Sequence, residues 1–186
     1  MTDAIVDLIL NIQQKEFNVP ITIEDQPDLM QIEDFYFANG GSFWGAFING
    51  ELVGTIALVK FDEKAAAIRK MFVKKEFRGK EYGIAQKLLE TLIAYCKKNG
   101  IEEVYLGTIS ILKAALRFYE RNHFEIIEKD IYRDYEDLYG ALNGQVDVSR
   151  DVNAGVDITK VTIAANEIPN GEYFVKVRHR DRNLNW

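Results

Sequence analysis

The sequence predicts an α/β fold in which helices flank a mixed, mostly antiparallel sheet. Three observations support this prediction. Apolar residues recur at helical spacing near the start, three strand-like runs follow one another across tight turns, and helix and strand patterns then alternate up to residue 130. The predicted element order is ααβββαβαβ, and such alternation is typical of sheets covered by layers of helices.

Two helices are expected at the start of the chain. Apolar residues at positions 5, 8, 9 and 12 follow the i, i+3, i+4, i+7 pattern of an amphipathic helix, which predicts a helix over 4–15. The segment 28–37 is predicted to form a second, shorter helix, which Asn39-Gly40-Gly41 would end.

Three strands are predicted next, over 42–48, 51–61 and 65–73. The first two flank Asn49-Gly50, a pair that favours the tightest hairpin turn because both residues adopt positive φ readily. Asp62-Glu63-Lys64 provides the second turn. The domain should therefore contain an antiparallel meander.

Helices and strands alternate in the following segment. A helix is predicted over 80–98, where an apolar stripe runs along one face, and Asn99-Gly100 should end it. A buried strand over 101–108, a helix over 110–121 and a strand over 124–130 complete the predicted core.

The composition changes near residue 140, so we predict a domain over 1–140 and a β-rich C-terminal segment over 141–186. In that segment, 161–168 and 172–179 flank Pro169-Asn170-Gly171, which is a hairpin signal. Its apolar face would need cover. We expect the hairpin to dock on an exposed sheet edge of this domain or of a second copy.

Bulk properties narrow the class of protein. The chain has 186 residues, 47% of them hydrophobic, and its formal net charge of -6 disfavours nucleic-acid binding. The single Cys96 excludes a disulfide framework and a cysteine zinc site, and no metal site is expected. No apolar run reaches about 20 residues, and the start lacks a basic signal-peptide region. We therefore expect a cytoplasmic protein that does not bind membranes.

Acidic residues are concentrated in the first part of the chain. Residues 1–51 carry nine acids against one base, Lys15. One interpretation is an ordinary solvated surface, and another is an electric field that attracts a cationic substrate.

The segment Arg78-Gly79-Lys80-Glu81-Tyr82-Gly83-Ile84-Ala85 joins a predicted strand to a predicted helix. Glycines allow a tight turn and a close approach to a ligand, and the start of a helix presents unpaired N–H groups. This combination indicates an anion site, most naturally for phosphate. A lone glycine pair would only indicate a turn, so a second motif is needed.

That second motif is Ala115-Leu116-Arg117-Phe118-Tyr119-Glu120. Together the two motifs resemble the GNAT family of acetyl-CoA-dependent N-acetyltransferases. Lys80-Glu81-Tyr82-Gly83-Ile84-Ala85 fits that family's pyrophosphate motif, and Phe118-Tyr119-Glu120 fits the signature of a later helix. The resemblance covers roughly 4–131 and implies a GNAT-like fold, acetyl-CoA as co-substrate and N-acetyltransferase activity.

The resemblance also implies site residues. The backbone of the strand end would bond the pantetheine arm and the thioester oxygen, and this role falls on Met71, Phe72 and Val73. The pyrophosphate would be held by the following turn, at Arg78, Gly79, Lys80, Gly83, Ile84 and Ala85. Met71, Phe72 and Val73 would also be expected as buried strand residues, and the two interpretations are compatible.

Tyr119 is the expected general acid for the departing CoA thiolate, with packing in the helix as the other interpretation. Glu33 and Asp34 are candidates on the acceptor side, and a water chain could serve equally as base. The acceptor would be a small-molecule amine, a protein lysine or an N-terminus, and a homodimer is possible. The alternative function is a CoA-binding or protein-interaction module without catalysis.

The chain departs from the family pattern in several places. Two residues, such as Glu81-Tyr82, are inserted between the glycines, Leu112 stands where many members have Asn, and His123 replaces a usual Gly. The family's first strand is also missing, because this chain begins at a helix. That strand was either lost or is supplied by the C-terminal β segment.

Overall fold

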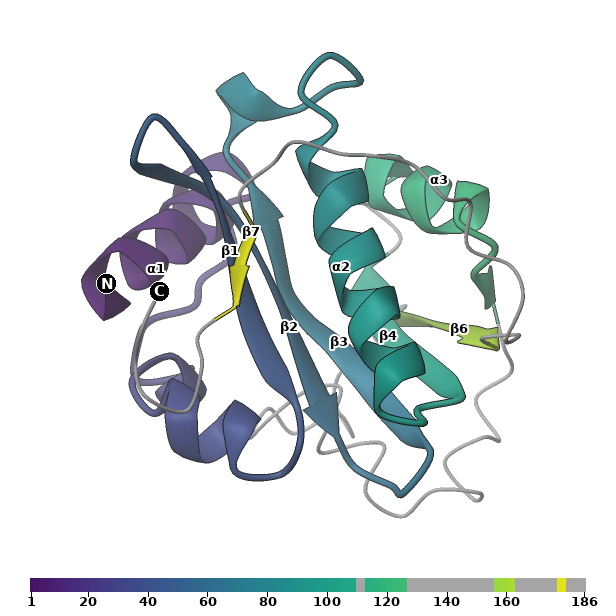
Figure 1. Ribbon diagram of the computed structural model, residues 1–186. Coiled ribbons are helices and arrows are strands. Elements are labelled where there is room, and N and C mark those ends of the chain that lie inside the picture. Colours follow the sequence, from purple (N-terminus) through teal and green to yellow (C-terminus); the bar gives the residue numbers. More distant parts are fainter. Residues whose placement is uncertain (110–112, 127–155, 163–176, 180–186) are drawn as a thin grey trace.

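The computed structural model describes residues 1–109, 113–126, 156–162 and 177–179. A seven-stranded sheet of order β5-β6-β4-β3-β2-β1-β7 forms the centre. α1 lies against one face of this sheet, and α2 and α3 lie against the other (Figure 1). The predicted α/β architecture with a mixed, mostly antiparallel sheet is confirmed.

The N-terminal segment folds as a chain of short helices. α1 spans Thr2–Leu10 and continues as the π-helix η1 over Asn11–Glu16. The predicted second helix is divided into the 3-10 turn η2, Pro27–Leu29, and the π-helix η3, Glu33–Phe37. Leu29, Ile32 and Tyr36 are all buried, so both pieces pack against the sheet.

The predicted meander is confirmed. β1 (Ser42–Ile48) pairs antiparallel with β2 (Glu51–Lys60), and β2 pairs antiparallel with β3 (Ala65–Val73). Asn49 and Gly50 have φ values of 50° and 84°, as the predicted tight turn requires.

The second half contains η4 (Lys75–Phe77), α2 (Ile84–Lys98), β4 (Glu103–Ile109), α3 (Lys113–Arg121) and β5 (Glu125–Ile126). α2 begins at Ile84, four residues later than predicted for the helix over 80–98. The reason is local. Gly83 adopts a left-handed conformation with φ of 61°, which cannot belong to a right-handed helix.

β3 and β4 are parallel neighbours for only a short distance. The three registered pairs are Ala65–Ala67 with Glu103–Tyr105. Beyond them β3 runs on to Val73 and β4 runs on to Ile109, with no further pairing between these two described strands. One backbone edge of β3 is therefore left open toward β4 from Ile68 onward.

Two strands come from the C-terminal segment. β6 (Val156–Thr162) pairs antiparallel with both β4 and β5, and β7 (Val177–His179) pairs antiparallel with β1. β7 occupies the edge at which a first strand was predicted to be missing, so this part of the segment supplies a strand there. The predicted boundary at residue 140 lies outside the described residues.

The predicted hairpin of 161–168 with 172–179 is wrong for the residues that the structure describes. Val161 and Thr162 pair with Val104 and Glu103, whereas β7 lies at the opposite edge of the sheet. The physical reason is that β4 and β5 offer β6 partners on both of its sides. A partner strand in a hairpin would satisfy only one side. Residues 163–176, including the predicted turn, lie outside the described part.

Each face of the sheet has its own hydrophobic core. The α2-side core includes Trp44, Ile56, Leu88 and Leu92, and the α1-side core includes Ile9, Leu29, Tyr36 and Phe43. Cys96 is buried in the α2-side core, and burial raises the pKa of its thiol to about 12. β3 lies between the two cores, with Ile68 and Val73 in the α2-side core and Phe72 against the α1-side core, and it carries most of the candidate site.

Candidate active site

A β-bulge in β3 determines which way its side chains face. Thr55 pairs with Phe72 and Ala57 with Arg69, so three steps along β3 match two steps along β2. Lys70 is in the left-handed region with φ of 52°, and its carbonyl accepts a 2.7 Å hydrogen bond from Thr55 Oγ1. Side chains alternate along a regular strand, and one extra residue resets that alternation.

Because of the bulge, Arg69 and Lys70 both face the α1 side, where both make ion pairs with Asp28. Ile68 and Met71 face the α2-side core. Without the extra residue, Lys70 would point into that apolar core. The bulge therefore places two cations on one face of the strand at the point where its edge toward β4 is open.

The predicted thioester segment lies along this open edge. Met71, Phe72 and Val73 form the end of β3, beyond its short ladder with β4. Met71 packs against the α2-side core, and Phe72 against the α1-side core. The carbonyl of Val73 accepts a 2.7 Å hydrogen bond from Arg78 Nε. Their part in holding a thioester stays a prediction.

The predicted phosphate turn leads directly into α2. Gly79 and Gly83 have φ values of 107° and 61°, and the N–H of Gly83 donates to the Gly79 carbonyl at 3.1 Å. The N–H of Gly83 is therefore used inside the turn, which sequence reasoning did not foresee. Ile84 and Ala85 lie in the first turn of α2, whose N–H groups no intrahelical carbonyl can reach. Among the described residues, no side chain caps this helix start, so the turn suits an anion.

Arg78 is tied to the N-terminal segment. Its guanidinium donates through both terminal nitrogens to the carboxylate of Glu16 at the end of η1, with Nη2 to Oε2 at 2.8 Å. It also lies over the ring of Phe17, 5.9 Å from the centroid. Lys80, by contrast, is exposed. The pairing with Glu16 was not predictable, because the two residues are distant in sequence.

Tyr119 reaches the thioester segment from α3. Its hydroxyl lies 3.0 Å from Met71 Sδ, and its ring packs edge-on against Phe118 and Phe124. Burial raises the pKa of Tyr119 above its ordinary value, so the phenol keeps its proton at neutral pH. The structure thus brings together Tyr119 and Met71, an arrangement compatible with both interpretations, and the role of Tyr119 as general acid stays a prediction.

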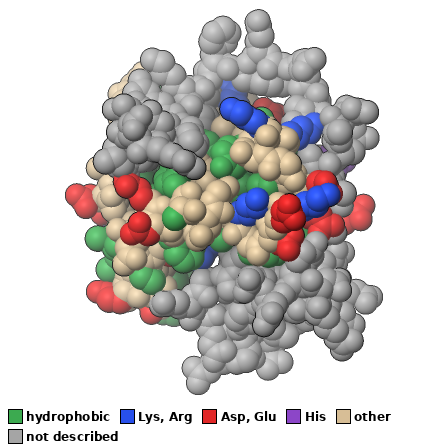
Figure 2. Space-filling model, turned by 60° about the horizontal axis from the view of Figure 1, so that its bottom comes forward, with side chains coloured by type: hydrophobic (Ala, Val, Ile, Leu, Met, Phe, Trp, Pro, Cys, Tyr) green, Lys and Arg blue, Asp and Glu red, His purple; other side chains and the backbone are tan. Residues whose placement is uncertain are grey.

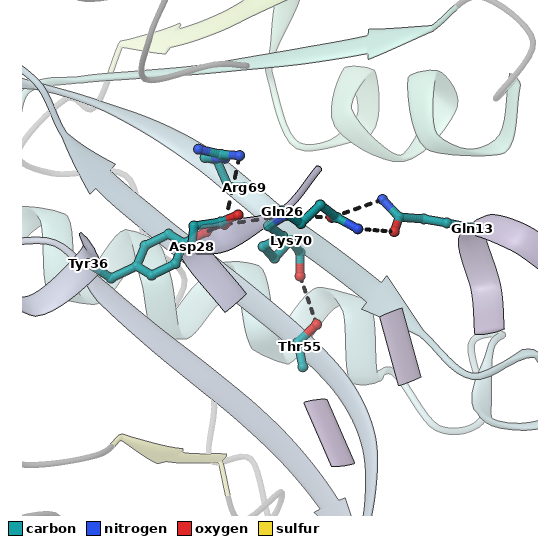
Figure 3. A network of polar contacts seen from close by, with 7 residues as sticks. All are labelled: Gln13, Gln26, Asp28, Tyr36, Thr55, Arg69 and Lys70. Carbon is teal, nitrogen blue, oxygen red and sulfur yellow. Dashed lines mark hydrogen bonds and ion pairs between the residues drawn. The ribbon is translucent and has the colours of Figure 1, made fainter. Parts of the chain in front are cut away.

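A buried polar network surrounds Lys70 on the α1 side (Figure 3). Lys70 Nζ donates to Gln26 Oε1 at 2.6 Å and lies 3.2 Å from Asp28 Oδ2. Tyr36 donates to the same Asp28 oxygen at 2.5 Å, and Gln26 exchanges hydrogen bonds with Gln13. Sequence reasoning missed this network. Its one signal is the pair Arg69-Lys70 inside an otherwise apolar strand.

Burial is the main cause of the shifted pKa values in the network. It lowers the pKa of Lys70 to about 8, with Asp28 opposing this change and Arg69 adding to it. Burial likewise raises the pKa of Tyr36. Lys70 is therefore still largely protonated at neutral pH.

The lowered pKa of Lys70 predicts a specific pH dependence of stability. Between pH 8 and the unfolded value near 10.5, the unfolded chain binds more protons than the folded one, so stability rises with pH. From pH 8 to pH 9 the contribution of Lys70 is about 1 kcal/mol. We therefore expect the free energy of unfolding, measured with urea, to rise between pH 8 and pH 9 by about 1 kcal/mol less in Lys70→Met than in the wild type. An identical change in both proteins would contradict the assignment.

Glu33 and Asp34 are exposed on η3. They are the first two residues of η3, and the ring of the next residue, Phe35, has its centroid 5.3 Å from the Arg69 guanidinium carbon. A role for either carboxylate as base stays a prediction.

The acidic residues of 1–51 do not form one uniform field. At least three of the nine form ion pairs within the described residues: Glu16 with Arg78, Glu51 with Lys74, and Asp28 with the two cations of β3. On the face shown in Figure 2, several acidic side chains lie directly beside Lys and Arg side chains. The charge pattern of the sequence therefore overstates the field that a substrate would meet.

Metal-ligand clusters and membrane-spanning helices are both absent from the described residues. No group of three His, Cys, Asp or Glu side chains there could hold a metal ion. Within the same residues, no helix has the length and apolar character needed to cross a membrane.

Comparison with known proteins gives consistent matches. The chain is 37% identical over 95 residues to an N-acetylaspartate synthetase of Danio rerio, covering 50% of this chain and 33% of that protein. It is 30% identical over 110 residues to an uncharacterised N-acetyltransferase of Escherichia coli K12, covering 58% and 64%. The chain thus spans about a third of the length of the first of these relatives.

The fold comparison agrees. A crystal structure of a GNAT-family acetyltransferase from Staphylococcus aureus Mu50 matches with a TM-score of 0.73 and 34% identity, covering 88% of this chain and 93% of that one. The family model described as Acetyltransferase (GNAT) family matches residues 6–124. The open edge of β3 and the glycine turn before α2 agree with these matches. The match of the family model, the relatives and the similar crystal structure together show that the chain belongs to the GNAT acetyltransferase family.

Proposed function

We propose that this protein is an N-acetyltransferase that moves the acetyl group of acetyl-CoA to a primary amine. One observation carries the proposal. The open edge of β3 ends beside both the glycine turn at the start of α2 and the hydroxyl of Tyr119. These three parts would serve as a pyrophosphate site, an oxyanion site and a proton donor for the departing thiolate.

The proposed binding mode follows the strand and the turn. The pyrophosphate of acetyl-CoA would lie at Gly79–Ala85, where N–H groups of Ile84 and Ala85 face outward and Lys80 adds charge. The pantetheine arm would run along the open edge, and the acyl oxygen would be held by backbone near Met71 and Phe72. Arg78 would hold the start of this turn in place, because it donates hydrogen bonds to the Val73 carbonyl and to the Glu16 carboxylate.

The proposed chemistry is a direct transfer. The amine nitrogen attacks the acyl carbon, a tetrahedral intermediate forms, and the C–S bond breaks. The departing thiolate takes a proton from Tyr119, and the amine gives up a proton to Glu33, Asp34 or water. Burial and the raised pKa keep the proton on Tyr119 until the thiolate departs, and the hydroxyl lies beside the thioester segment, 3.0 Å from Met71 Sδ.

The phosphate site predicts a result for Gly83. Gly83→Glu and Gly83→Gln impose the same strain at a positive φ and are similar in size, and a Cβ there meets nothing closer than 3.9 Å. We expect CoA to bind roughly tenfold more weakly to the Glu variant than to the Gln variant, since only Glu opposes the phosphate charge. Calorimetry measures the two affinities. Equal affinities would place the pyrophosphate elsewhere.

The alternative function is a CoA-binding or protein-interaction module without catalysis. A panel of amines assayed for release of free CoA separates the two, because a binding module would release none. The cationic acceptor, the cytoplasmic location and the possible homodimer stay predictions. The acidic excess behind the first of these is partly neutralised by the ion pairs of Glu16, Asp28 and Glu51.

A further inference from the structure

The guanidinium of Arg69 is buried with few partners. The side chain is 10% exposed, yet its nearest acidic atom, Asp28 Oδ2, lies 3.7 Å from Nη2, beyond a good hydrogen bond. The Phe35 ring stacks at 5.3 Å and accepts no ordinary hydrogen bond. Nη1 has no hydrogen-bond partner among the described residues. A buried charged donor left unpaired is costly, so this arrangement suits a ligand that pairs with it.

The charges around Arg69 do not balance. Arg69 and Lys70 are two buried cations, and Asp28 is the one acid that forms an ion pair with either of them in the described part of the chain. One Asp28 oxygen serves Arg69, Lys70 and the Tyr36 hydroxyl together. Among the described residues, one positive charge is thus left without an acidic partner in a buried site. An anion would supply the missing charge.

This unbalanced charge lies next to the proposed thioester site. Successive residues of a strand are about 3.3 Å apart, and Arg69 and Lys70 directly precede Met71. Met71 and Tyr119 contact each other on the α2 side of β3, whereas the two cations face the α1 side. A small molecule bound at Arg69 would have to pass the open edge of β3, which β4 leaves unpaired from Ile68 onward, for its amine to reach the acyl carbon.

We infer that the acceptor amine carries a carboxylate, as an amino acid does, and that Arg69 binds this carboxylate with Lys70 beside it. The inference rests on the proposed acetyl transfer. A guanidinium presents two parallel N–H groups that match a carboxylate, which makes Arg69 the specific partner. The carboxylate takes no part in bond making. It orients the amine and balances the buried charge, whereas a polyamine would add positive charge beside two cations.

The experiment compares amino acids with their own carboxamides as acceptors, in a buffer free of carboxylate ions. The two compounds of a pair have the same amine, side chain and size, and differ in the charge of one group. For the amino acid that reacts fastest, we expect kcat/KM to exceed that of its amide by about tenfold or more, the difference between a charge-assisted and a neutral hydrogen bond. Equal rates, or a preference for amides, would overturn the inference.

Variants assign the preference to Arg69. Arg69→Met keeps an apolar stem against Phe35 and leaves Lys70 to pair with Asp28. We expect it to remove the preference for the acid over the amide while leaving the affinity for CoA unchanged. Arg121→Met, at an exposed position of α3, is the matched control and should keep the preference. A preference that survives in Arg69→Met would overturn the assignment.

A binding measurement separates this inference from the proposed function. The melting temperature is recorded with CoA present and with each acid or amide added. Stabilisation by the acid alone, lost in Arg69→Met, supports the carboxylate site even if no amine is acetylated, in which case only the proposed function fails. Acetylation with no selectivity in rate or in melting temperature overturns the carboxylate site and leaves the proposed function standing. If Arg69→Met does not fold, Arg69→Lys takes its place in both experiments, because it keeps the charge and loses the paired N–H groups.

Discussion

A chain that ends at residue 140 is expected to lose its cooperative fold and to aggregate. Such a chain lacks β6, which pairs with β4 at seven positions and with β5 at two. β5 would lose its neighbour in the described sheet, and β4 would present an unpaired edge next to the open edge of β3. Each lost backbone hydrogen bond contributes about 1 kcal/mol, and the whole fold is stable by only about 5–15 kcal/mol.

A chain that ends at residue 175 is the control. It keeps β6 and lacks β7, which pairs with β1 at only three positions and lies at the sheet edge. We expect this chain to stay folded, with a melting temperature lower by roughly 5 °C. Thermal unfolding and size-exclusion chromatography measure both chains. A 1–140 chain that remains monomeric, with the melting temperature and CoA affinity of the full chain, would show that β6 contributes little.

Tyr119→Phe is expected to lower kcat by roughly 10²-fold and to keep both the fold and the affinity for acetyl-CoA. The substitution removes only the hydroxyl that lies 3.0 Å from Met71 Sδ, and the aromatic contacts with Phe118 and Phe124 remain. Loss of a positioned general acid costs about 10²–10⁴ in rate. Rapid-mixing assays of CoA release measure kcat, and thermal unfolding checks the fold.

The control for this experiment is Tyr95→Phe. Tyr95 also carries a hydroxyl with hydrogen bonds, here to the carbonyls of Gly40 and Gly41, and it lies on α2 away from Met71. Its loss should change stability slightly and kcat little. If Tyr119→Phe has the rate of the wild type, or if it fails to fold, Tyr119 is a packing residue.

Local signals in the sequence were sufficient for most of the first 109 residues. Asn49-Gly50 predicted its turn because few other residue pairs tolerate two positive φ values. The stripe on α2 predicted its buried face, including Leu88, Leu92 and Cys96. In both cases a short stretch of chain contains all the information that the structure uses.

Features that depend on distant residues were not predicted. Lys70 and Gln26 are hydrogen-bonded across 44 positions, and Arg78 and Glu16 are joined across 62, so no local pattern could reveal either pair. The bulge was also hidden, because an extra residue in β3 is visible only against the register of β2. The hairpin prediction failed for a related reason. Local turn chemistry cannot anticipate that β4 and β5 pair with β6 on its two sides.

The position of β6 has a consequence for how the protein folds during synthesis. β4 and β5 leave the ribosome before β6, and the sheet closes between them only when Val156–Thr162 has followed. Pairs between segments that are far apart in sequence form slowly, since a long loop must close first. For that interval the edge of β4 is open to other nascent chains. The final yield of folded protein should therefore depend on how fast the last part of the chain is made.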